Sequence, residues 1–483
     1  MAESLNPMLP TVNSGSSYNP TTVSKATRGP QYLGAIIVCL AAVSAGTAIG
    51  WSAPVIPQLE NGTTAPFPVT KSESSWIGAF LPVGALFGAI PGGILADKVG
   101  RKLTILSLAG PFLINWGLIV IANSATLMIV GRFFAGLSTG AICVTGSMYI
   151  GEFAETEIRG VLGSYFQLFL CVGILISFVL GAFLDYVQLS LTLAVIPIIF
   201  VITFKFMPES PVYLMTIGKR TEAEDAIRWF RGKNYNVTPV IEEIQHTIDA
   251  TAGKESSVAD LFKTRGNLRA FISSLGLMLF QQFSGINAVI FYTVTIFELA
   301  GSSLNPKVAA ILIGSIQVVM AYIAATIIDK AGRKIFLSLS GGIMFICLGG
   351  IGFFFQQKES DVDVSNIGWL PLSCLLLYIV GFCLGYGPIP WMIMGELFTP
   401  ELKGVASGIA VLTNWFLTFV VTKSFDGMVA AFGISGTFFT FMAFVFAGLV
   451  FVQVVLPETR GKSLQEIQDE LNGRKHIRKS ANI

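Results

Sequence analysis

Apolar runs of about 20 residues recur along this entire chain. A run of that length, folded as a helix, crosses the apolar core of a bilayer, which is roughly 30 Å thick. Of the 483 residues, 53% are hydrophobic and only 12% are charged, a balance far from that of a soluble domain. The sequence therefore predicts an all-α membrane protein. Its twelve expected spans are residues 33–56, 75–96, 103–123, 126–148, 161–184, 187–206, 270–292, 307–328, 336–356, 369–394, 404–424 and 434–456.

Three charged motifs occur twice, in the same order. The first is Asp97-Lys98-Val99-Gly100-Arg101-Lys102, repeated as Asp329-Lys330-Ala331-Gly332-Arg333-Lys334. In the second, Glu152 precedes Arg159 by seven residues, as Glu396 precedes Lys403. The third is Pro208-Glu209-Ser210-Pro211, matched by Pro457-Glu458-Thr459-Arg460. This order predicts a duplication into two six-helix halves.

The distribution of cations sets the expected topology. Short loops on one side carry most of the lysines and arginines, whereas the other side holds only Lys71, Lys307, Lys358 and Lys423. By the positive-inside rule both termini are expected in the cytoplasm. The first 30 residues are polar and lack a cleavable signal pattern, which predicts a disordered tail. The expected regions are this tail (1–30), the two bundles (31–206 and 266–456), a linker of short amphipathic intracellular helices (207–265) and a cytoplasmic C-terminal tail (457–483). Within the C-terminal tail, the sequence predicts one short amphipathic helix over residues 463–471.

Charged residues at the cytoplasmic helix ends suggest how such a bundle moves. Carboxylates and guanidiniums on facing helices pair when the two halves close on that side and separate when they open, so that they bias one of two states. We expect these pairs to favour the outward-facing state. The gate candidates are Asp97, Arg101, Glu152, Arg159, Asp329, Arg333, Glu396 and Lys403, with Pro388 and Pro390 as a helix-breaking hinge that helps close the outer side.

Amide and indole side chains inside the spans indicate a neutral ligand. Amides donate and accept hydrogen bonds together, which suits the hydroxyls of a polyol, and an indole offers an apolar platform for a sugar ring. The alternative for each amide is an interhelical hydrogen bond, and for each indole simple packing. The candidate ligand-binding residues are Gln167, Gln281, Gln282, Asn287, Gln317, Trp391, Asn414 and Trp415.

Enzymatic functions find little support in the sequence. The only histidines, His246 and His476, lie in polar cytoplasmic segments, and no Walker-type phosphate loop is present. We therefore expect no catalytic residue, no metal and no cofactor. The net charge of +2 gives no sign of a nucleic-acid partner, and no obligate protein partner is evident. Asn61 begins a glycosylation sequon in the first extracellular loop.

Over about residues 33–470 the chain resembles the sugar porter family of the major facilitator superfamily. Besides the duplicated motifs, the resemblance rests on Gly131-Arg132, Gln281-Gln282-Phe283-Ser284-Gly285-Ile286-Asn287, Gly387-Pro388-Ile389-Pro390-Trp391 and Pro457-Glu458-Thr459-Arg460-Gly461-Lys462. The stretch from Gly387 to Glu396, together with Asn414-Trp415, looks most like the insect trehalose transporter branch. The resemblance implies twelve helices in two halves, a small neutral sugar contacted by the amides and Trp391, and alternating access in the plasma membrane.

Three positions depart from the family pattern. Many hexose carriers have a glutamate where this chain has Cys383, so the hydrogen bonds to the sugar must differ and glucose is not to be assumed. Lys403 stands where arginine is usual, which removes bidentate pairing. Proton-driven relatives carry an aspartate in the first span where this chain has Ser52, facing the residue that matches Arg132.

The missing aspartate favours facilitated diffusion, because a proton then has no obvious carrier in the membrane. The expected substrate is trehalose or a hexose such as glucose. Proton-coupled sugar symport remains the main alternative. A drug or organic-ion exporter would show acids or bases in the central cavity, and a non-transporting sugar sensor would carry a long cytoplasmic tail.

Overall fold

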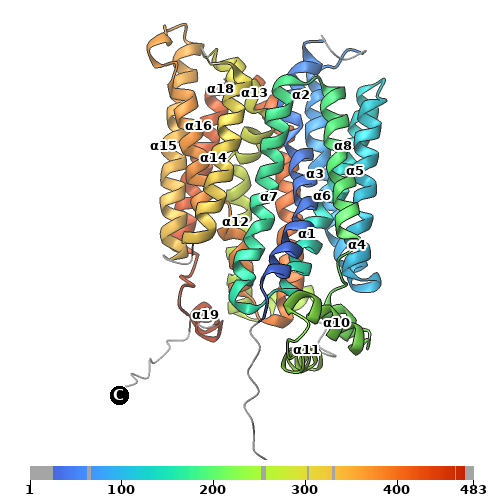
Figure 1. Ribbon diagram of the computed structural model, residues 1–483. Helices are drawn as coiled ribbons and strands as arrows, with labels where there is room; N and C mark the ends of the chain where they lie inside the picture. Colours follow the sequence, from blue (N-terminus) through green and yellow to red (C-terminus); the bar gives the residue numbers. More distant parts are fainter. Residues whose placement is uncertain are drawn as a thin grey trace, which may run out of the picture.

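The computed structural model describes residues 26–62, 67–251, 257–301, 304–328, 332–462 and 464–473, and within these ranges it contains helices and no strand. Figure 1 shows a bundle of long, roughly parallel helices. The N-terminal half consists of α1 (Gly29–Gly50), α2 (Ser52–Glu60), α3 (Lys71–Val99), α4 (Arg101–Ser107), α5 (Ala109–Val120), α6 (Ala125–Phe153), α7 (Thr156–Phe183) and α8 (Tyr186–Phe204).

The described parts of the linker and of the C-terminal half are also helical. The linker forms α9 (Pro211–Thr216), α10 (Arg220–Arg231), α11 (Thr238–Thr251) and η1 (Val258–Phe262). The C-terminal half consists of α12 (Arg265–Phe283), α13 (Ile286–Ala300), α14 (Pro306–Ile327), α15 (Arg333–Glu359), η2 (Ser365–Ile367), α16 (Leu370–Leu384), α17 (Ile389–Leu397) and α18 (Pro400–Val454), and α19 (Leu464–Leu471) follows it. The short helix expected near the C-terminus is thus confirmed.

Twelve membrane crossings account for these helices. Within the described residues, eleven helical stretches are long and apolar enough to span a membrane. The last, Glu401–Val454, has 54 residues, and a helix of that length would extend about 80 Å at 1.5 Å per residue, far beyond one bilayer core. Its backbone reverses at Gly433, where φ is 72°, a value that favours glycine. The two arms of α18 are therefore the expected eleventh and twelfth spans.

The turn at Gly433 is held by a single carboxylate. Glu359, at the end of α15, accepts hydrogen bonds from the backbone N–H of Ile434 (2.8 Å) and of Ser435 (3.3 Å). The hydroxyl of Ser435 also donates to it. Because the first N–H groups of a helix lack partners within the helix, Glu359 caps the second arm of α18.

Small residues let the helices approach closely. In the N-terminal half α3 packs along α6 and α1 along α7. A Cβ added at Gly84 would lie 2.0 Å from the carbonyl oxygen of Phe133, and one at Gly136 would lie 2.0 Å from that of Leu81. These two glycines therefore permit the backbone contact between α3 and α6, as expected of a membrane bundle.

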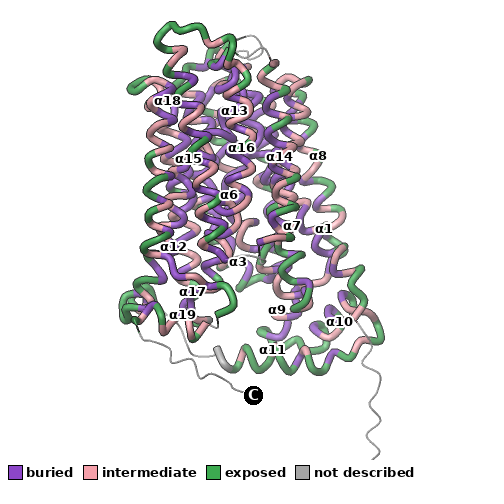
Figure 2. Tube along the Cα trace, turned by 90° about the vertical axis from the view of Figure 1, so that its left-hand side faces the viewer, coloured by how far each residue is buried: buried purple, intermediate pink, exposed green. Residues whose placement is uncertain are grey.

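The halves meet mainly where α3 packs on α18, α7 on α14 and α2 on α13. Figure 2 shows buried residues inside the bundle and exposed ones around its sides. Large apolar side chains on the surface are mostly exposed, including Phe183, Phe206, Ile346 and Val454. Such surfaces suit lipid rather than water.

The linker helices gather at one end of the bundle, which also carries α19 and is called the inner end below (Figure 1). A separate apolar cluster joins α9, α10 and α11. Phe230 of α10 stacks on Phe153 of α6, with ring centroids 4.3 Å apart. The expected amphipathic helices are therefore present, and they are anchored to the N-terminal half.

Candidate functional site

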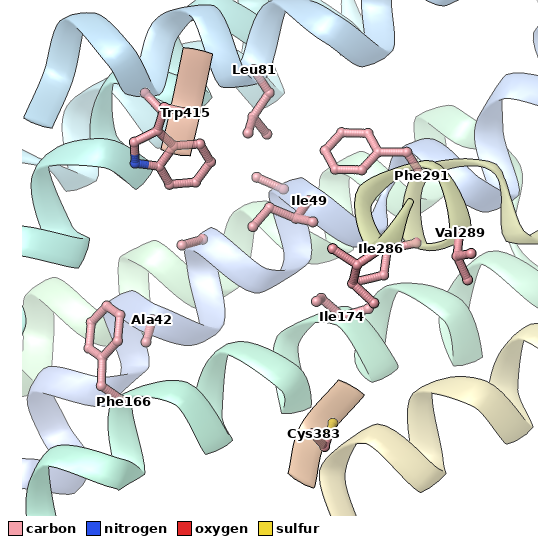
Figure 3. Close-up of a cluster of buried hydrophobic side chains, with 14 of the residues drawn as sticks. Ala42, Ile49, Leu81, Phe166, Ile174, Ile286, Val289, Phe291, Cys383 and Trp415 are labelled. Carbon is pink, nitrogen blue, oxygen red and sulfur yellow. The ribbon is translucent and has the colours of Figure 1, made fainter. Parts of the chain in front are cut away.

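Buried apolar side chains from both halves meet at the centre of the bundle. In Figure 3, α1, α3 and α7 of the N-terminal half contribute side chains to the same cluster as α13, α16 and α18 of the C-terminal half. A charged ligand here would lose its hydration without gaining a partner, so an uncharged one is favoured. The labelled residues are Ala42, Ile49, Leu81, Phe166, Ile174, Ile286, Val289, Phe291, Cys383 and Trp415.

Four of the predicted amides form one hydrogen-bonded network in the C-terminal half. Asn414 Nδ2 donates to Gln281 Oε1 at 2.7 Å, and Gln282 Nε2 reaches the same oxygen at 3.5 Å. Asn287 Nδ2 donates to Gln282 Oε1 and also to Thr418 Oγ1, the latter at 3.3 Å. The structure thus brings α12, α13 and α18 together through the amides that the sequence singles out.

Gln281 also supports the break in the tenth span. The helix is interrupted between Leu384 and Ile389, next to the prolines predicted to break it. Gln281 Nε2 donates to the carbonyl oxygens of Tyr386 (2.7 Å) and Gly387 (3.0 Å), which the interruption leaves without helical partners. Both ends of the Gln281 amide are therefore bonded to protein groups, which suits a residue that orients the network.

Two other predicted residues carry buried polar atoms that have no partner among the described residues. They are Nε1 of Trp415, a donor, and Oε1 of Gln317, an acceptor. Trp415 directly follows Asn414 on α18, and Gln317 lies on α14. Leaving such a group unpaired costs about 1 to 3 kcal/mol, so both atoms are suited to bond a ligand hydroxyl.

The remaining two candidates lie apart from the amide network. Gln167, on α7 of the other half, is exposed, and its Nε2 lies 3.6 Å from Cys171 Sγ. Trp391 is half-buried on α17 and packs against a small cluster formed by Met278, Met394 and Ala410. The amide of Gln167 and the ring of Trp391 therefore remain available to a ligand.

Sequence reasoning missed Thr418 and Tyr386. Thr418 follows Asn414 by one helical turn, so its spacing on the same face could have identified it. Tyr386 contributes through its carbonyl oxygen, and its buried hydroxyl has no partner among the described residues. No sequence signal marks a backbone oxygen, which is why this contact was not foreseen.

The duplicated charges form one network at the inner end of the N-terminal half. Arg101 binds Glu152 through Nε (3.0 Å) and a terminal nitrogen (2.9 Å), and also contacts the exposed Asp97 at 3.2 Å. Glu209 accepts from the backbone N–H groups of Arg101 and Lys102, each at 3.0 Å, and so caps α4. The hydroxyl of Ser210 donates to Glu152.

The C-terminal half repeats the contacts of Arg101, Glu209 and Ser210 with their partners. Arg333 binds Glu396 through Nε (3.2 Å) and a terminal nitrogen (2.8 Å), and Thr459 donates its hydroxyl to Glu396. Glu458 accepts from the backbone N–H groups of Arg333 (3.0 Å) and Lys334 (3.1 Å), which caps α15. The counterpart of Asp97 in this half, Asp329, lies outside the described residues. The three duplicated motifs are therefore parts of one structural unit.

Backbone N–H groups stabilise the ionised form of Glu458. Burial alone would raise the pKa of this carboxyl. The N–H groups of Arg460, Lys334, Arg333 and Thr459 stabilise the carboxylate more strongly and lower its pKa below the ordinary value.

The ion pairs seen here connect helices within each half rather than across the two halves. Arg101 and Glu152 both belong to the N-terminal half, and Arg333 and Glu396 to the C-terminal half. In contrast, Arg159 donates to the carbonyl of Ala154 at 3.3 Å. Among the described residues neither Arg159 nor Lys403 lies within ion-pair distance of a carboxylate.

Residues 35–471 match the family described as sugar (and other) transporter. The chain belongs to the sugar transporter family. It is 40% identical to the facilitated trehalose transporter Tret1 of Polypedilum vanderplanki, over 95% of this chain and 91% of that relative. It is also 40% identical to Tret1 of Drosophila mojavensis over 95% of this chain, but this covers only 53% of that relative. The chain thus spans about half the length of several curated relatives.

Solved structures of this superfamily share the fold of this sugar transporter family member. It superposes on the inward-open xylose transporter XylE from E. coli with a TM-score of 0.77, covering 91% of this chain and 99% of that one. The partially occluded inward-open form of XylE gives 0.75. Sequence identity is 22% in both cases. The expected major facilitator fold, with two six-helix halves, is thereby confirmed.

In this family member the fully buried Arg132 is satisfied without a carboxylate. It donates to the carbonyl oxygens of Ala48 (2.5 Å) and Ile77 (3.2 Å) and to Ser52 Oγ at 2.9 Å. Its guanidinium also lies over the Trp51 ring, 5.2 Å from the centroid. Ser52, which stands where proton-driven relatives have an aspartate, is thus a direct ligand of Arg132.

The sequon residue Asn61 is exposed at the end of α2, a position that suits its predicted modification.

In the part of the chain that the structure describes, no group of three or more histidine, cysteine or acidic residues could hold a metal ion.

Proposed function

We propose that this protein is a facilitative transporter that moves trehalose, or a hexose such as glucose, across the plasma membrane by alternating access. Its membership in the sugar transporter family and the names of its insect relatives support the choice of substrate. Both termini are placed in the cytoplasm by this proposal, because the described inner end carries the duplicated cationic motifs.

The proposal rests on one observation. The uncharged centre of the bundle contains polar groups that hydrogen-bond to one another and others that have no partner among the described residues. The network of Gln281, Gln282, Asn287 and Asn414 lies beside the unpartnered Nε1 of Trp415 on the same half. Sugar hydroxyls both donate and accept, so they satisfy amides and an indole N–H without any charge. Gln167, Gln317 and Trp391 would complete the sugar site as the halves close around it.

Facilitated diffusion is favoured over proton symport by the surroundings of Arg132. A coupled proton needs a carboxylate that is loaded and unloaded during the cycle. Arg132 instead bonds two carbonyl oxygens and Ser52. Because this arrangement already satisfies the guanidinium, neither state requires a proton to move.

The inner charges supply the proposed gate. In this structure Arg101 and Arg333 hold the glutamates of their own halves, while Arg159 and Lys403 bind no carboxylate. When the inner ends approach, these free cations would reach the glutamates of the opposite half and favour the outward-facing state. Each partly solvated pair contributes about 1 kcal/mol or less, so several must act together.

Uptake by purified protein in liposomes tests this function. Labelled trehalose and glucose are offered with and without a pH gradient. We expect saturable uptake of at least one sugar that equilibrates without accumulation and is independent of the gradient. Uptake that requires an inward proton gradient would replace uniport by symport. Absence of uptake of both sugars, from protein that binds either one, would favour the sugar sensor.

A further inference from the structure

A lysine from the C-terminal half crosses to the N-terminal half at the outer end of the bundle. Lys423, on the first arm of α18, donates a hydrogen bond to Ser75 Oγ of α3 at 2.8 Å. Its ammonium also lies over the Trp76 ring, 4.4 Å from the centroid. Lys423 is half-buried and Ser75 is almost fully buried, so neither contact is freely exchanged with water. The sequence places Lys423 on the outer side, at the end of the predicted span 404–424, and the structure adds its contacts with α3.

The surroundings of Lys423 place two acids of opposite halves near one another. Asp426, three residues further along α18, lies within electrostatic reach of Glu60 at the end of α2, and also of Lys423 and Lys71. Glu60 accepts a hydrogen bond from the hydroxyl of Ser74. Like charges that face each other across an interface oppose its closure. Lys423 offsets this repulsion while it bridges the halves.

The helices around Lys423 are packed as a closed outer end. Tyr292 of α13 stacks on Phe425, with centroids 4.9 Å apart, and donates to the carbonyl of Thr422 at 3.3 Å. A Cβ added at Gly78 of α3 would lie 3.6 Å from the Tyr292 hydroxyl. Three helices from both halves therefore meet at the level of Lys423.

We infer that Lys423, Ser75 and Trp76 form an outer latch, a contact between the halves that holds the inward-facing state and must break for the outer side to open. The ammonium supplies three stabilising effects at one point: a hydrogen bond to Ser75, a cation–π contact with Trp76 and an attraction to Asp426. The inference rests on the proposed alternating access, but on no particular sugar.

An accessibility experiment tests the latch without any sugar. The full chain, with its six native cysteines replaced, carries Ile56→Cys as a reporter, because Ile56 is buried on α2 and faces Gly78. A membrane-impermeant maleimide is applied from the outside. We expect Lys423→Met to raise the labelling rate about fivefold, the loss that a cation–π contact of ordinary strength predicts. Lys423→Arg, which keeps a cation over the ring, should label like the parent.

Matched variants separate the latch from a general effect of charge. Lys358→Met removes another outer lysine whose contacts, to the carbonyls of Leu299 and Ala300, stay within one half, and its labelling rate should be unchanged. Adding Asp426→Asn to Lys423→Met should restore part of the slow labelling. Surface expression and thermal unfolding confirm that each variant is folded.

Three outcomes would overturn the inference: parental labelling of a folded Lys423→Met, an equal rise with Lys358→Met, or no rescue by Asp426→Asn. Liposomes that transport neither trehalose nor glucose, while Lys423→Met still speeds labelling, would reject the proposed substrate and leave the latch standing.

Discussion

The two ends of the bundle are stabilised in different ways. At the inner end the polar networks are duplicated, and the pairs of Arg101 and Arg333 act inside one half each. At the outer end Lys423 has no duplicate and joins the two halves directly. Duplicated sequence therefore builds two rigid bodies, whereas single, unrepeated residues govern how these bodies meet. The amide network at the centre is also unrepeated among the described residues, although it lies within the C-terminal half.

Breaking the inner networks should have the largest effect, and on stability. Glu152→Gln removes the largely buried carboxylate that Arg101 binds through two nitrogens and leaves it only the exposed Asp97, and Glu396→Gln likewise removes the glutamate that binds Arg333. Loss of one partner of a buried pair costs about 3 to 5 kcal/mol, and partial solvation reduces this to about 2 to 3 kcal/mol here. Thermal unfolding in detergent measures the loss. Glu157→Gln, at a position that is 77% exposed, is the control and should change stability by less than about 0.5 kcal/mol.

The same pair of variants sharpens the comparison between halves. Glu152 is 13% exposed and Glu396 is 25% exposed, so the N-terminal variant should lose more stability than its counterpart. A variant of one half that left the unfolding temperature unchanged would show that the two networks, although alike in geometry, are unequal in energy.

Changes at the centre should affect transport while sparing stability. Gln282→Ala removes an amide that binds Asn287, and Trp391→Ala removes a half-buried ring. Each should reduce sugar uptake at least about tenfold, which corresponds to about 1.4 kcal/mol, at normal surface expression. Uptake is measured in liposomes. If both variants transport as well as the parent, the proposed sugar site is wrong.

A smaller change tests the unpartnered indole nitrogen at the centre. Trp415→Phe keeps an aromatic ring but removes the buried N–H that has no protein partner. If this group binds a sugar hydroxyl, its loss should weaken apparent affinity about fivefold, in line with one hydrogen bond of about 1 kcal/mol. The KM for uptake measures this, and the maximal rate should change little. An unchanged KM would assign Trp415 to packing alone.

Acid should weaken the C-terminal network slightly through Glu458. Because the pKa of Glu458 lies below its ordinary value, its carboxylate stabilises the fold above that ordinary value, and the stabilisation is lost as the pH falls toward the lowered pKa. The effect should stay below about 1 kcal/mol for this half-buried group. Glu458→Gln should flatten the fall in unfolding temperature between about pH 5 and pH 3. An equally steep fall in the variant would remove Glu458 from this role.

The fold could be predicted because bilayer thickness and backbone hydrogen bonding leave few solutions for long apolar segments. The duplicated motifs also predicted two halves. Sequence could not show that the pairs of Arg101 and Arg333 close within a half, because spacing identifies charges but not the helix that each one faces. It likewise missed the contact of Gln281 with two backbone oxygens, which exists only because the helix breaks at Gly385 to Pro388. Sequence also could not show that Lys423, at the outer end of a predicted span, reaches across to α3 of the other half.

The turn at Gly433, capped by Glu359, has a practical consequence for anyone labelling this protein. Two membrane crossings follow each other there without an intervening loop. The backbone at this point therefore has no loop that could accommodate an insertion. An epitope tag or a glycan acceptor inserted at Gly433 would separate Glu359 from Ile434 and Ser435 and unwind the start of the last crossing. The exposed end of α2 at Asn61 is the safer place for such an insertion.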